Sequence, residues 1–483
     1  MYEARVISGN SEHDGVNSET GIRFQRALFV WLKISLLSFG GPAGQIAVMH
    51  RLLVDELKWV SEKRFLHALN FCMLLPGPEA QQLTIYLGWL LHRVRGGVVA
   101  GVMFVLPGAL TVLVLSMIYV TYQQSAAVGS VFFGVKAAVL AIVTTALWRL
   151  GRKVIRRRFL MVITAASFIA SFVFSIPFPL VIIGAALAAL LGGGAEPSQS
   201  EAGRKHDGDG PGGVASAGYR DSESDFESDS RAIDSRVTTQ PPARHWALLV
   251  ALTCGVLWLA PVAVLHGWLG AGHIYSQQAM FFSQVAVVTF GGAYAVLSYM
   301  AQQTVGHYGW LSAGEMLDGL GMAETTPGPL IMVTQFVGFI GAFRNPGILD
   351  PMLAGCLGAF VTTWVTFAPC FLWIFLGAPY IEALRGNRTL AVALTGITAA
   401  VVGVVLNLAI WFGLRVMFTE LVEVSLPGGG LAMTLPSPAS FDPLASAIMA
   451  TSLLAIARFR VGMVKVLVTS AATGLALGSV GLV

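Results

Sequence analysis

Leu74-Leu75-Pro76-Gly77-Pro78 contains a Pro-Gly-Pro triplet that returns as Pro327-Gly328-Pro329 in a second apolar run. Proline removes a backbone donor and clashes with the preceding helical turn, while glycine permits backbone angles closed to other residues. Such a triplet stops a helix, and at membrane depth a broken backbone is tolerated only where protein or a water-filled cavity covers it. The pair therefore predicts helices that end inside the membrane around a site. A kink that serves packing alone is the alternative.

The two triplets belong to an internal repeat with an offset of 251 residues. Phe39-Gly40-Gly41 returns as Phe290-Gly291-Gly292, and Trp59 returns as Trp310 at the same offset. Over the ungapped positions 38–78, 12 of 41 residues are identical, which is far above chance. We interpret the chain as a duplication.

Composition places this duplication in a membrane. The chain has 483 residues, of which 55% are apolar and 12% charged, and its mean hydropathy is +0.71. A water-soluble enzyme has a charged fraction of about a quarter, so that class is excluded. The four cysteines form no Cys-x-x-Cys pair, which indicates neither a disulfide frame nor a metal site. We predict an all-α polytopic membrane protein.

Thirteen apolar runs approach the ~20 residues that a helix needs to cross a bilayer. They are 27–49, 71–91, 98–122, 127–150, 159–177, 178–194, 245–268, 279–303, 316–343, 352–380, 390–415, 441–459 and 461–483. We predict a cytoplasmic tail (1–23), a first repeat of about six spans (24–194), a flexible cytoplasmic linker (195–244), an extra connecting span (245–268) and a second repeat of about six spans (275–483). The extra span inverts the second repeat, as in many secondary transporters. The fold class is about 13 transmembrane helices in two inverted-topology repeats with broken or re-entrant helices.

Lysine and arginine placement gives the orientation. With the N-terminus in the cytoplasm, 21 of the 30 Lys and Arg residues fall on the cytoplasmic side and six on the outer side, in agreement with the positive-inside rule. The segment 50–70 weakens the pattern, because it carries four positive charges on the expected outer side. An amphipathic helix at the interface is the alternative for this segment.

The breaks favour an anion site. A helix that restarts after a break directs free N–H groups and a positive dipole end at the gap. Lys33 and Lys136 lie inside apolar runs, where a cation is costly and usually functional; Lys33 is near a span end and could instead snorkel to the interface. Gln81, Thr325 and Thr326, together with Gln82, could donate neutral hydrogen bonds or simply join helices.

Two carboxylates flank the triplets. Glu79 follows the first triplet and Glu324 precedes the second. A carboxylate beside an anion is unfavourable unless it is protonated or paired, so each is interpreted as a proton-coupling group or, alternatively, as a helix cap. Enzyme signatures such as HExxH, GxxxxGK[ST] and GxSxG do not occur, and the sequence predicts no enzyme, metal, cofactor or nucleic-acid partner.

The sequence resembles the chromate ion transporter (CHR) family. The resemblance rests on motifs that recur in order through both halves: Phe29-Val30-Trp31-Leu32-Lys33, Ser38-Phe39-Gly40-Gly41-Pro42, Leu74-Leu75-Pro76-Gly77-Pro78, Tyr86-Leu87-Gly88, Thr289-Phe290-Gly291-Gly292, Gly309-Trp310-Leu311-Ser312 and Ala323-Glu324-Thr325-Thr326-Pro327-Gly328-Pro329. It implies export of chromate from the bacterial cytoplasm, a chemiosmotic driving force, chromate resistance and competition by sulfate. It also implies a fused duplication whose halves have opposite orientation.

We therefore expect an exporter in the bacterial inner membrane that works by alternating access, with chromate as substrate, sulfate as competitor and the lipid bilayer as surroundings. The alternatives are a transporter of sulfate or another oxyanion, uptake in place of export, and a sensor or scaffold without transport. The sequence leaves open whether the protein is a homodimer. The residues expected to bind substrate are Lys33, Phe39, Gly40, Gly41, Pro76, Gly77, Pro78, Gln81, Lys136, Phe290, Gly291, Gly292, Thr325, Thr326, Pro327, Gly328 and Pro329.

Overall fold

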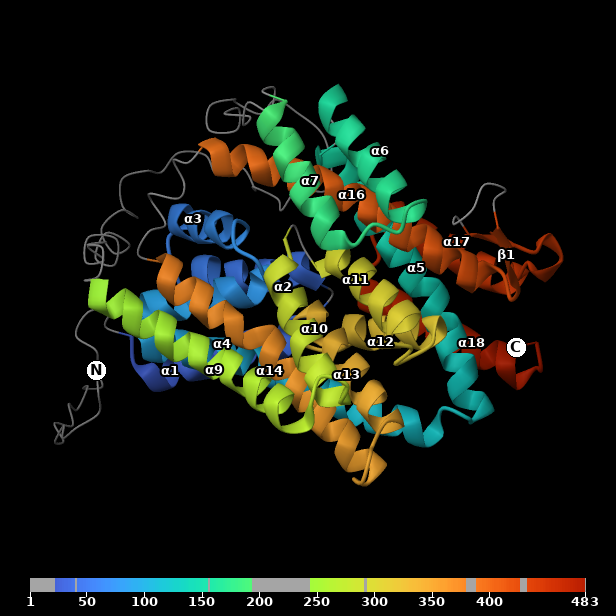
Figure 1. Ribbon diagram of the computed structural model, residues 1–483, viewed down its shortest axis with the longest axis horizontal. Helices are drawn as coiled ribbons and strands as arrows, with labels where there is room; N and C mark the ends of the chain where they lie inside the picture. The colour runs from blue at the N-terminus through green and yellow to red at the C-terminus, as the bar shows by residue number, and fades with distance from the viewer. Residues whose placement is uncertain are drawn as a thin grey trace, which may run out of the picture.

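The computed structural model describes residues 22–39, 41–154, 157–192, 244–290, 293–378, 388–425 and 432–482. The protein is an all-α polytopic membrane protein (Figure 1). Five of the described helices are long and apolar enough to cross a bilayer: α4 (Glu79–Tyr122), α5 (Ala126–Val154), α9 (Arg244–Leu269), α14 (Pro351–Gly377) and α16 (Arg388–Met417). The predicted tail and linker lie almost wholly outside the described residues.

The first repeat begins with short helices. These are α1 (Phe24–Leu37), α2 (Gly41–His50), the π-helical turn η1 (Arg51–Glu56) and α3 (Glu62–Cys72). Helix α4 then reverses direction at His92 and Arg93, where Arg93 has φ of 52°. The backbones of Gly88 and Gly96, on either side of the reversal, touch, since a Cβ on Gly88 would lie 2.5 Å from the Gly96 oxygen. Residues 79–91 and 94–122 of α4 therefore form a helical hairpin.

The second repeat has the same order of elements. It contains α10 (Ile274–Val288), α11 (Ala293–Ala301), the π-helical turn η2 (Gln302–His307), α12 (Ala313–Thr325), the 3-10 turn η3 (Leu330–Met332) and α13 (Val333–Arg344), followed by α14. The two π-helical turns are separated by the repeat offset of 251 residues. The serines that cap α3 and α12, Ser61 and Ser312, are equivalent as well.

The helices of the first repeat turn back at their breaks. The His92 ring contacts the backbone oxygen of Ile22 at 2.9 Å, which places the start of α1 beside the reversal of α4. Near the end of α2, the Met49 sulfur is contacted by the Thr84 hydroxyl at 3.1 Å. Helix α2 therefore runs back along residues 79–91. The α1–α2 pair and the pair formed by α3 and residues 79–91 are therefore re-entrant hairpins. Both open toward the side where α1 begins, which we call the first side.

This geometry corrects two expectations. The runs 27–49 and 71–91 do not each cross as one helix, because the described backbone is not helical at 38–39 or at 73–78. The segment 50–70 lies on the first side, with Arg93 and Arg95, and not on the opposite side. Its four positive charges therefore add to the basic excess of the first side. The count of 13 crossings is not confirmed.

The second repeat opens toward the opposite side, which we call the second side. Helix α14 runs antiparallel to residues 94–122 of α4, since Phe371 packs on Gly101 and Phe375 packs on Gly97. Helix α14 therefore starts on the second side, and the Tyr275 hydroxyl of α10 donates to the oxygen of Ala354 near that start. Arg344 at the end of α13 donates to the oxygen of Trp310, which brings the loop before α12 to the same side.

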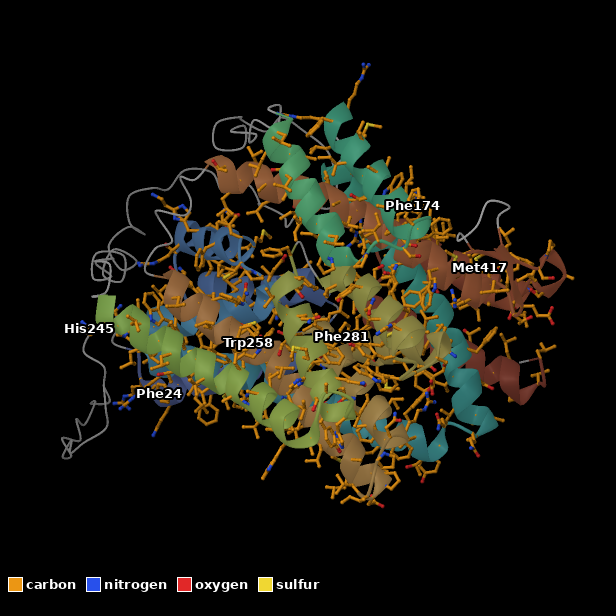
Figure 2. All side chains as sticks on the ribbon, in the orientation of Figure 1. Phe24, Phe174, His245, Trp258, Phe281 and Met417 are labelled. Carbon is orange, nitrogen blue, oxygen red and sulfur yellow. The ribbon has the colours of Figure 1, made fainter. Side chains whose placement is uncertain are left out.

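Helix α9 connects the two sides. In Figure 2, Phe24 of α1 and His245 of α9 lie at the same end of the molecule, and Met417 at the end of α16 lies at the other. The end of α9 reaches α10, because the Ser276 hydroxyl donates to the oxygen of Leu265. The two repeats are thus inverted with respect to each other.

Among the described residues, six further helices form what we call the six-helix bundle: α5, α6 (Arg158–Phe172), α7 (Phe178–Leu191), α16, α17 (Pro443–Ala457) and α18 (Met463–Ser479). The repeats exchange partners here, since α6 and α7 pack on α16 while α17 and α18 pack on α5 (Figure 1). Glycines permit close approach at both contacts: Gly134 of α5 meets the backbone of Ser470, and Gly396 of α16 meets that of Ala185.

A short antiparallel hairpin joins α16 to α17. It consists of β1 (Leu421–Ser425) and β2 (Ala432–Pro436), with Val422 opposite Leu435, and is followed by the 3-10 turn η5 (Pro438–Ser440). The hydrophobic core has two parts. Among the described residues, one part lies between α1, α2, α3, residues 79–104 of α4 and the end of α14, and the other extends from residues 105–119 of α4 and from α10–α14 into the six-helix bundle. We call the helices α1–α4 and α10–α14 the hairpin core.

Candidate functional site

The breaks of the two repeats touch each other. The backbone N–H of Gly77 donates to the carbonyl oxygen of Thr289 at 2.8 Å, and the N–H of Gly328 donates to the oxygen of Ser38 at 2.9 Å. Ser38 and Thr289 are the residues that precede the two Phe-Gly-Gly motifs. Each Pro-Gly-Pro break of one repeat is therefore bonded to the Phe-Gly-Gly break of the other, and the four hairpin tips meet in the interior of the hairpin core.

Glycine is required at both contacts. Gly77 has φ of +121° and Gly328 has φ of +100°, which are backbone angles that side chains rarely adopt. The residues that pack against Gly77 and Gly328 occupy equivalent positions in the two repeats. Cys370, beside the proline of α14, lies against Gly77, and Gly108, beside the proline of α4, lies against Gly328. Each tip thus packs on a proline-containing turn of the other repeat's long helix.

Four helices restart at the tips. They are α2 at Gly41, α4 at Glu79, α11 at Ala293 and the segment that begins at Leu330. Each begins where the tips meet, so the partial positive charge of its N-terminal end lies at that place. The arrangement favours a small anion. The N–H groups of Gly77 and Gly328 do not contribute, because they are already bonded to backbone oxygens.

Buried amides surround the tips. Gln45 donates to the oxygen of Gly328, and Gln82 donates to the oxygen of Pro76, both at 2.6 Å. Gln335 donates to the oxygen of Ala109 at 2.8 Å. Gln81 is fully buried, and neither its nitrogen nor its oxygen has a hydrogen-bond partner among the described residues. A buried amide without partners is costly, so Gln81 is the side chain best suited to receive a polar substrate.

Glu324 lies beside the Phe-Gly-Gly tip of the first repeat. Its Oε1 accepts a hydrogen bond of 2.7 Å from the Tyr294 hydroxyl, and that hydroxyl lies close to Gly41. The other oxygen, Oε2, is buried and has no hydrogen-bond partner in the described part of the chain. Glu79 is half-buried as the first residue of α4, where the helix dipole stabilises a carboxylate. The two carboxylates are not equivalent in the repeat: Glu79 corresponds to Leu330, and Glu324 to Met73.

The two threonines already use their donors. The Thr325 hydroxyl donates to the oxygen of Gly321 at 3.0 Å, and that of Thr326 donates to the oxygen of Ala323 at 3.3 Å. Of the Phe-Gly-Gly motifs, Phe39 is exposed and Phe290 is half-buried, while Gly40, Gly291 and Gly292 lie outside the described residues.

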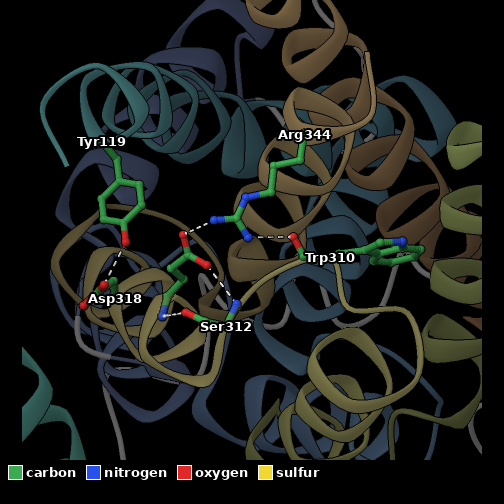
Figure 3. Close-up of polar contacts among 6 residues, drawn as sticks. Tyr119, Trp310, Ser312, Asp318 and Arg344 are labelled. Atoms are coloured by element: carbon green, nitrogen blue, oxygen red, sulfur yellow. Dashed lines mark hydrogen bonds and ion pairs between the residues drawn. The ribbon is translucent and has the colours of Figure 1, made fainter. Parts of the chain in front are cut away.

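The structure does not bring the two lysines to the tips. Lys33 lies on the exposed face of α1, while Trp31 and Ile34 of the same helix are buried. The Nζ atom of Lys136 lies 3.4 Å from Oδ1 of Asp318 on α12. The other oxygen of Asp318 accepts a hydrogen bond of 2.9 Å from the Tyr119 hydroxyl (Figure 3).

Sequence reasoning missed Asp318. The signal was present, because Asp318 and Lys136 both lie in apolar runs, and charges inside a membrane usually pair with each other. A second cluster of polar side chains lies at the start of α12, one turn before Asp318. There Arg344 binds Glu315 at 2.6 Å, and Glu315 also caps the helix through the backbone of Ser312 (Figure 3). Among the described residues, no three His, Cys, Asp or Glu side chains gather as a metal site.

Comparison with known proteins adds to this geometry. A family model described as "Chromate transporter" matches residues 26–191 and 276–475. The chain is 32% identical over 382 residues to the "Chromate transport protein" of Pseudomonas aeruginosa, covering 78% of this chain and 77% of that protein. It is 27% identical over 393 residues to the "Probable chromate transport protein" of Synechococcus elongatus, covering 79% and 83%. The "Chromate transport protein" of Cupriavidus metallidurans is 26% identical over 403 residues, covering 79% and 80%. No solved structure matches the chain.

Proposed function

The chain belongs to the chromate transporter family, and from that premise we propose that it exports chromate from the bacterial cytoplasm by alternating access. The protein would reside in the inner membrane with its N-terminus in the cytoplasm. It would draw on the chemiosmotic gradient and confer resistance to chromate. Sulfate, a tetrahedral dianion of similar size, would compete for the site.

The observation that carries the proposal is the meeting of four helix N-termini at the bonded tips. Chromate presents four oxygens, which need several hydrogen-bond donors, and two negative charges, which need a positive potential. At the tips this potential would come without a lysine or arginine in contact with the anion. Four dipole ends supply that potential where water is excluded. The side chains at this place are mostly neutral, which lets a dianion enter and leave. Binding that is favourable but not tight suits a transporter.

Gln81 is the side-chain donor that we propose for the chromate oxygens. The backbone around the two Pro-Gly-Pro and the two Phe-Gly-Gly motifs would complete the shell, with Thr325 and Thr326 contributing after their hydroxyls rotate. Lys33 and Lys136 would act from a distance, since neither lies at the tips in this conformation. Their charges would draw the dianion toward the membrane interior.

Glu324 is the proposed proton-coupling group, with Glu79 as the second candidate. The support for Glu324 is its place beside the first repeat's tip, where one oxygen is bonded to Tyr294 and the other has no partner among the described residues. A buried carboxylate is costly while ionised. Proton uptake at Glu324 would therefore respond to an anion at the tips.

The orientation and the energetics favour export. With 50–70 on the first side, the basic excess of that side grows, and the positive-inside rule places the first side in the cytoplasm. One charge that crosses ~100 mV is worth ~2.3 kcal/mol, so a dianion leaving a negative interior gains about twice that. This alone sustains about a thousandfold gradient.

The experiment uses everted membrane vesicles that contain the full chain and labelled chromate. We expect chromate to accumulate inside the vesicles when their interior is positive, and excess sulfate to reduce the rate. Vesicles from cells without the protein are the control. Absence of protein-dependent accumulation would contradict export of chromate. Accumulation of labelled sulfate at a higher rate than chromate would instead favour the sulfate alternative.

A further inference from the structure

The equivalent hairpins of the two repeats differ in their packing. Helix α12 of the second repeat packs against α5, α16 and α18 of the six-helix bundle. Helix α3, its equivalent, packs against α4 and has no comparable contact with the bundle among the described residues. Side-chain exposure follows this difference. Leu317 is 1% exposed and its equivalent Leu66 is 44% exposed.

The difference extends through both hairpins of each repeat. On α11, Ser298 is buried, whereas its equivalent on α2, Ala47, is exposed. At the end of α12, Glu324 is 2% exposed, whereas its equivalent Met73 is 39% exposed. The hairpins on the second side are therefore enclosed between the rest of the hairpin core and the bundle, while those on the first side present a face that the described bundle helices do not cover.

The enclosed contact includes an ion pair whose acidic partner is buried. Lys136 on α5 of the bundle pairs with Asp318 on α12 of the hairpin core, and Asp318 is 3% exposed. One turn further along α12, Gly321 lies so close to Val135 that a Cβ at Gly321 would be 3.8 Å from the Cβ of Val135. Charge pairing and close backbone approach thus hold the same two helices together.

The repeat identifies the equivalent positions on the first side. In the hairpins the offset of 251 relates Asp318 to His67 and Gly321 to Asn70. In the long helices the offset is 262, because Gly134-Val135-Lys136-Ala137-Ala138-Val139 aligns with Gly396-Ile397-Thr398-Ala399-Ala400-Val401. Gly134 and Gly396 also make equivalent contacts with the last helix of the other repeat. Lys136 therefore corresponds to Thr398, and Val135 to Ile397.

We propose that the contact of α12 with α5, held by the Lys136–Asp318 pair, is a closed gate on the second side, and that the first side closes by the equivalent contact of α3 with α16. In that second conformation His67 lies beside Thr398 and Asn70 beside Ile397, while Asp318 separates from Lys136. Inverted repeats permit this exchange, because each half can adopt the other's arrangement. The gates also differ in strength. An ion pair closes the second side, whereas a histidine and a hydroxyl close the first.

This inference rests on the alternating access of the proposed function and adds the residues of its two gates. Two engineered disulfides test it. The first joins Val135→Cys to Gly321→Cys, whose Cβ separation of 3.8 Å suits a disulfide. The second joins Asn70→Cys to Ile397→Cys, which should pair only after the first side closes. Each double variant is kept in reducing agent as its own control, and chromate flux is measured before and after oxidation.

We expect the 135–321 disulfide to form readily in resting vesicles and to abolish chromate flux until it is reduced. The 70–397 disulfide should form when chromate and a membrane potential are applied together, and it should also abolish flux. A 135–321 cross-link that leaves flux intact would overturn the proposal. So would failure of the 70–397 pair to cross-link in protein that transports chromate.

A third variant tests the ion pair itself. Asp318→Asn keeps an acceptor for Tyr119 and removes the charge that faces Lys136, so it should lower the 135–321 cross-linked fraction and raise that of 70–397. Unchanged fractions would contradict the role of the pair. These cross-linking results are read separately from substrate identity. If the unmodified chain moved sulfate and not chromate, sulfate would replace chromate as the trigger, and only the proposed substrate would fail.

Discussion

The N–H of Gly77 donates a hydrogen bond of 2.8 Å to the carbonyl oxygen of Thr289, which joins the broken backbone of one repeat to that of the other. The equivalent bond runs from Gly328 to Ser38. A helix break inside a membrane leaves backbone groups unpaired, and each unpaired group costs several kcal/mol in hydrocarbon. Each repeat forms a hydrogen bond with a backbone group that the break in the other repeat would leave unpaired. This explains why both motifs occur in both halves, since neither half could bury its tips alone.

Substitution of the tip glycine tests this contact. Gly77→Ala places a side chain at φ of +121° and brings its Cβ within 2.8 Å of Gln82 Nε2, which must release the oxygen of Pro76. We expect loss of chromate flux and a stability loss of about 1–3 kcal/mol from backbone strain. Flux in vesicles and thermal unfolding in detergent measure the two effects.

Gly347→Ala is the matched control for that variant. Gly347 has φ of +60° and open space around it, so it carries the backbone strain without the site. It should lose stability and keep its flux. Equal loss of flux in both variants would show that general destabilisation, and not the tip, limits transport.

Gln81 and Gln82 should respond differently to the same change. Gln81→Leu removes a buried amide without hydrogen-bond partners among the described residues, so we expect unchanged or higher thermal stability and weaker chromate binding. Gln82→Leu breaks the bond to Pro76 and should lower stability by about 1 kcal/mol or more. Thermal unfolding with and without chromate compares the two variants. If Gln81→Leu retained full stabilisation by chromate, Gln81 would not be a ligand.

Residue chemistry explains why the breaks were predictable from sequence and their topology was not. Proline and glycine act on their own backbone, so 76–78 and 327–329 reveal a break without knowledge of the neighbours. The direction after a break depends on tertiary contacts such as that of Thr84 with Met49. A run as long as 27–49 fits a full crossing equally well by length. The expected side of 50–70 was wrong for this reason.

The same limit applies to the lysines. Position in an apolar run marked Lys136 as functional, but the run does not say which distant residue it faces. Asp318 supplies that partner from the other repeat, away from the tips. The glutamines Gln45 and Gln335 were missed because a single amide in an apolar helix has no spacing pattern. Only the folded chain shows that they contact backbone oxygens at the tips or in α4.

The proton-coupling role of Glu324 predicts a specific change in driving force. In everted vesicles an acidic lumen should accelerate chromate accumulation, because protons leave the lumen as chromate enters it. Glu324→Gln keeps the size of the side chain and cannot ionise, so flux should lose its response to the pH gradient and keep its response to potential. Glu79→Gln is the comparison, as Glu79 is the second candidate. A Glu324→Gln protein that still responded to the pH gradient would exclude this role.

The corrected topology predicts which residues face the cytoplasm. Cysteine introduced at Lys58 should react with a membrane-impermeant maleimide in everted vesicles and not in intact cells, as should cysteine at Arg93. Cysteine at Gly347, on the second side, should react in intact cells. Labelling of Lys58→Cys from outside the cell would restore the full crossing at 27–49 and contradict the re-entrant hairpin.

The Lys136–Asp318 pair predicts non-additive stability effects. Lys136→Met leaves the carboxylate of Asp318, whose side chain is 5% exposed, buried with the Tyr119 hydroxyl as its remaining donor among the described residues, and loss of one partner of such a pair costs about 3–5 kcal/mol. Asp318→Asn should cost less, because the Lys136 side chain is 30% exposed and can reach water. The double variant Lys136→Met with Asp318→Asn leaves no unpaired charge, so it should be more stable than Lys136→Met alone. Thermal unfolding of the three proteins measures the coupling, and costs that simply add would mean that the two side chains do not stabilise each other.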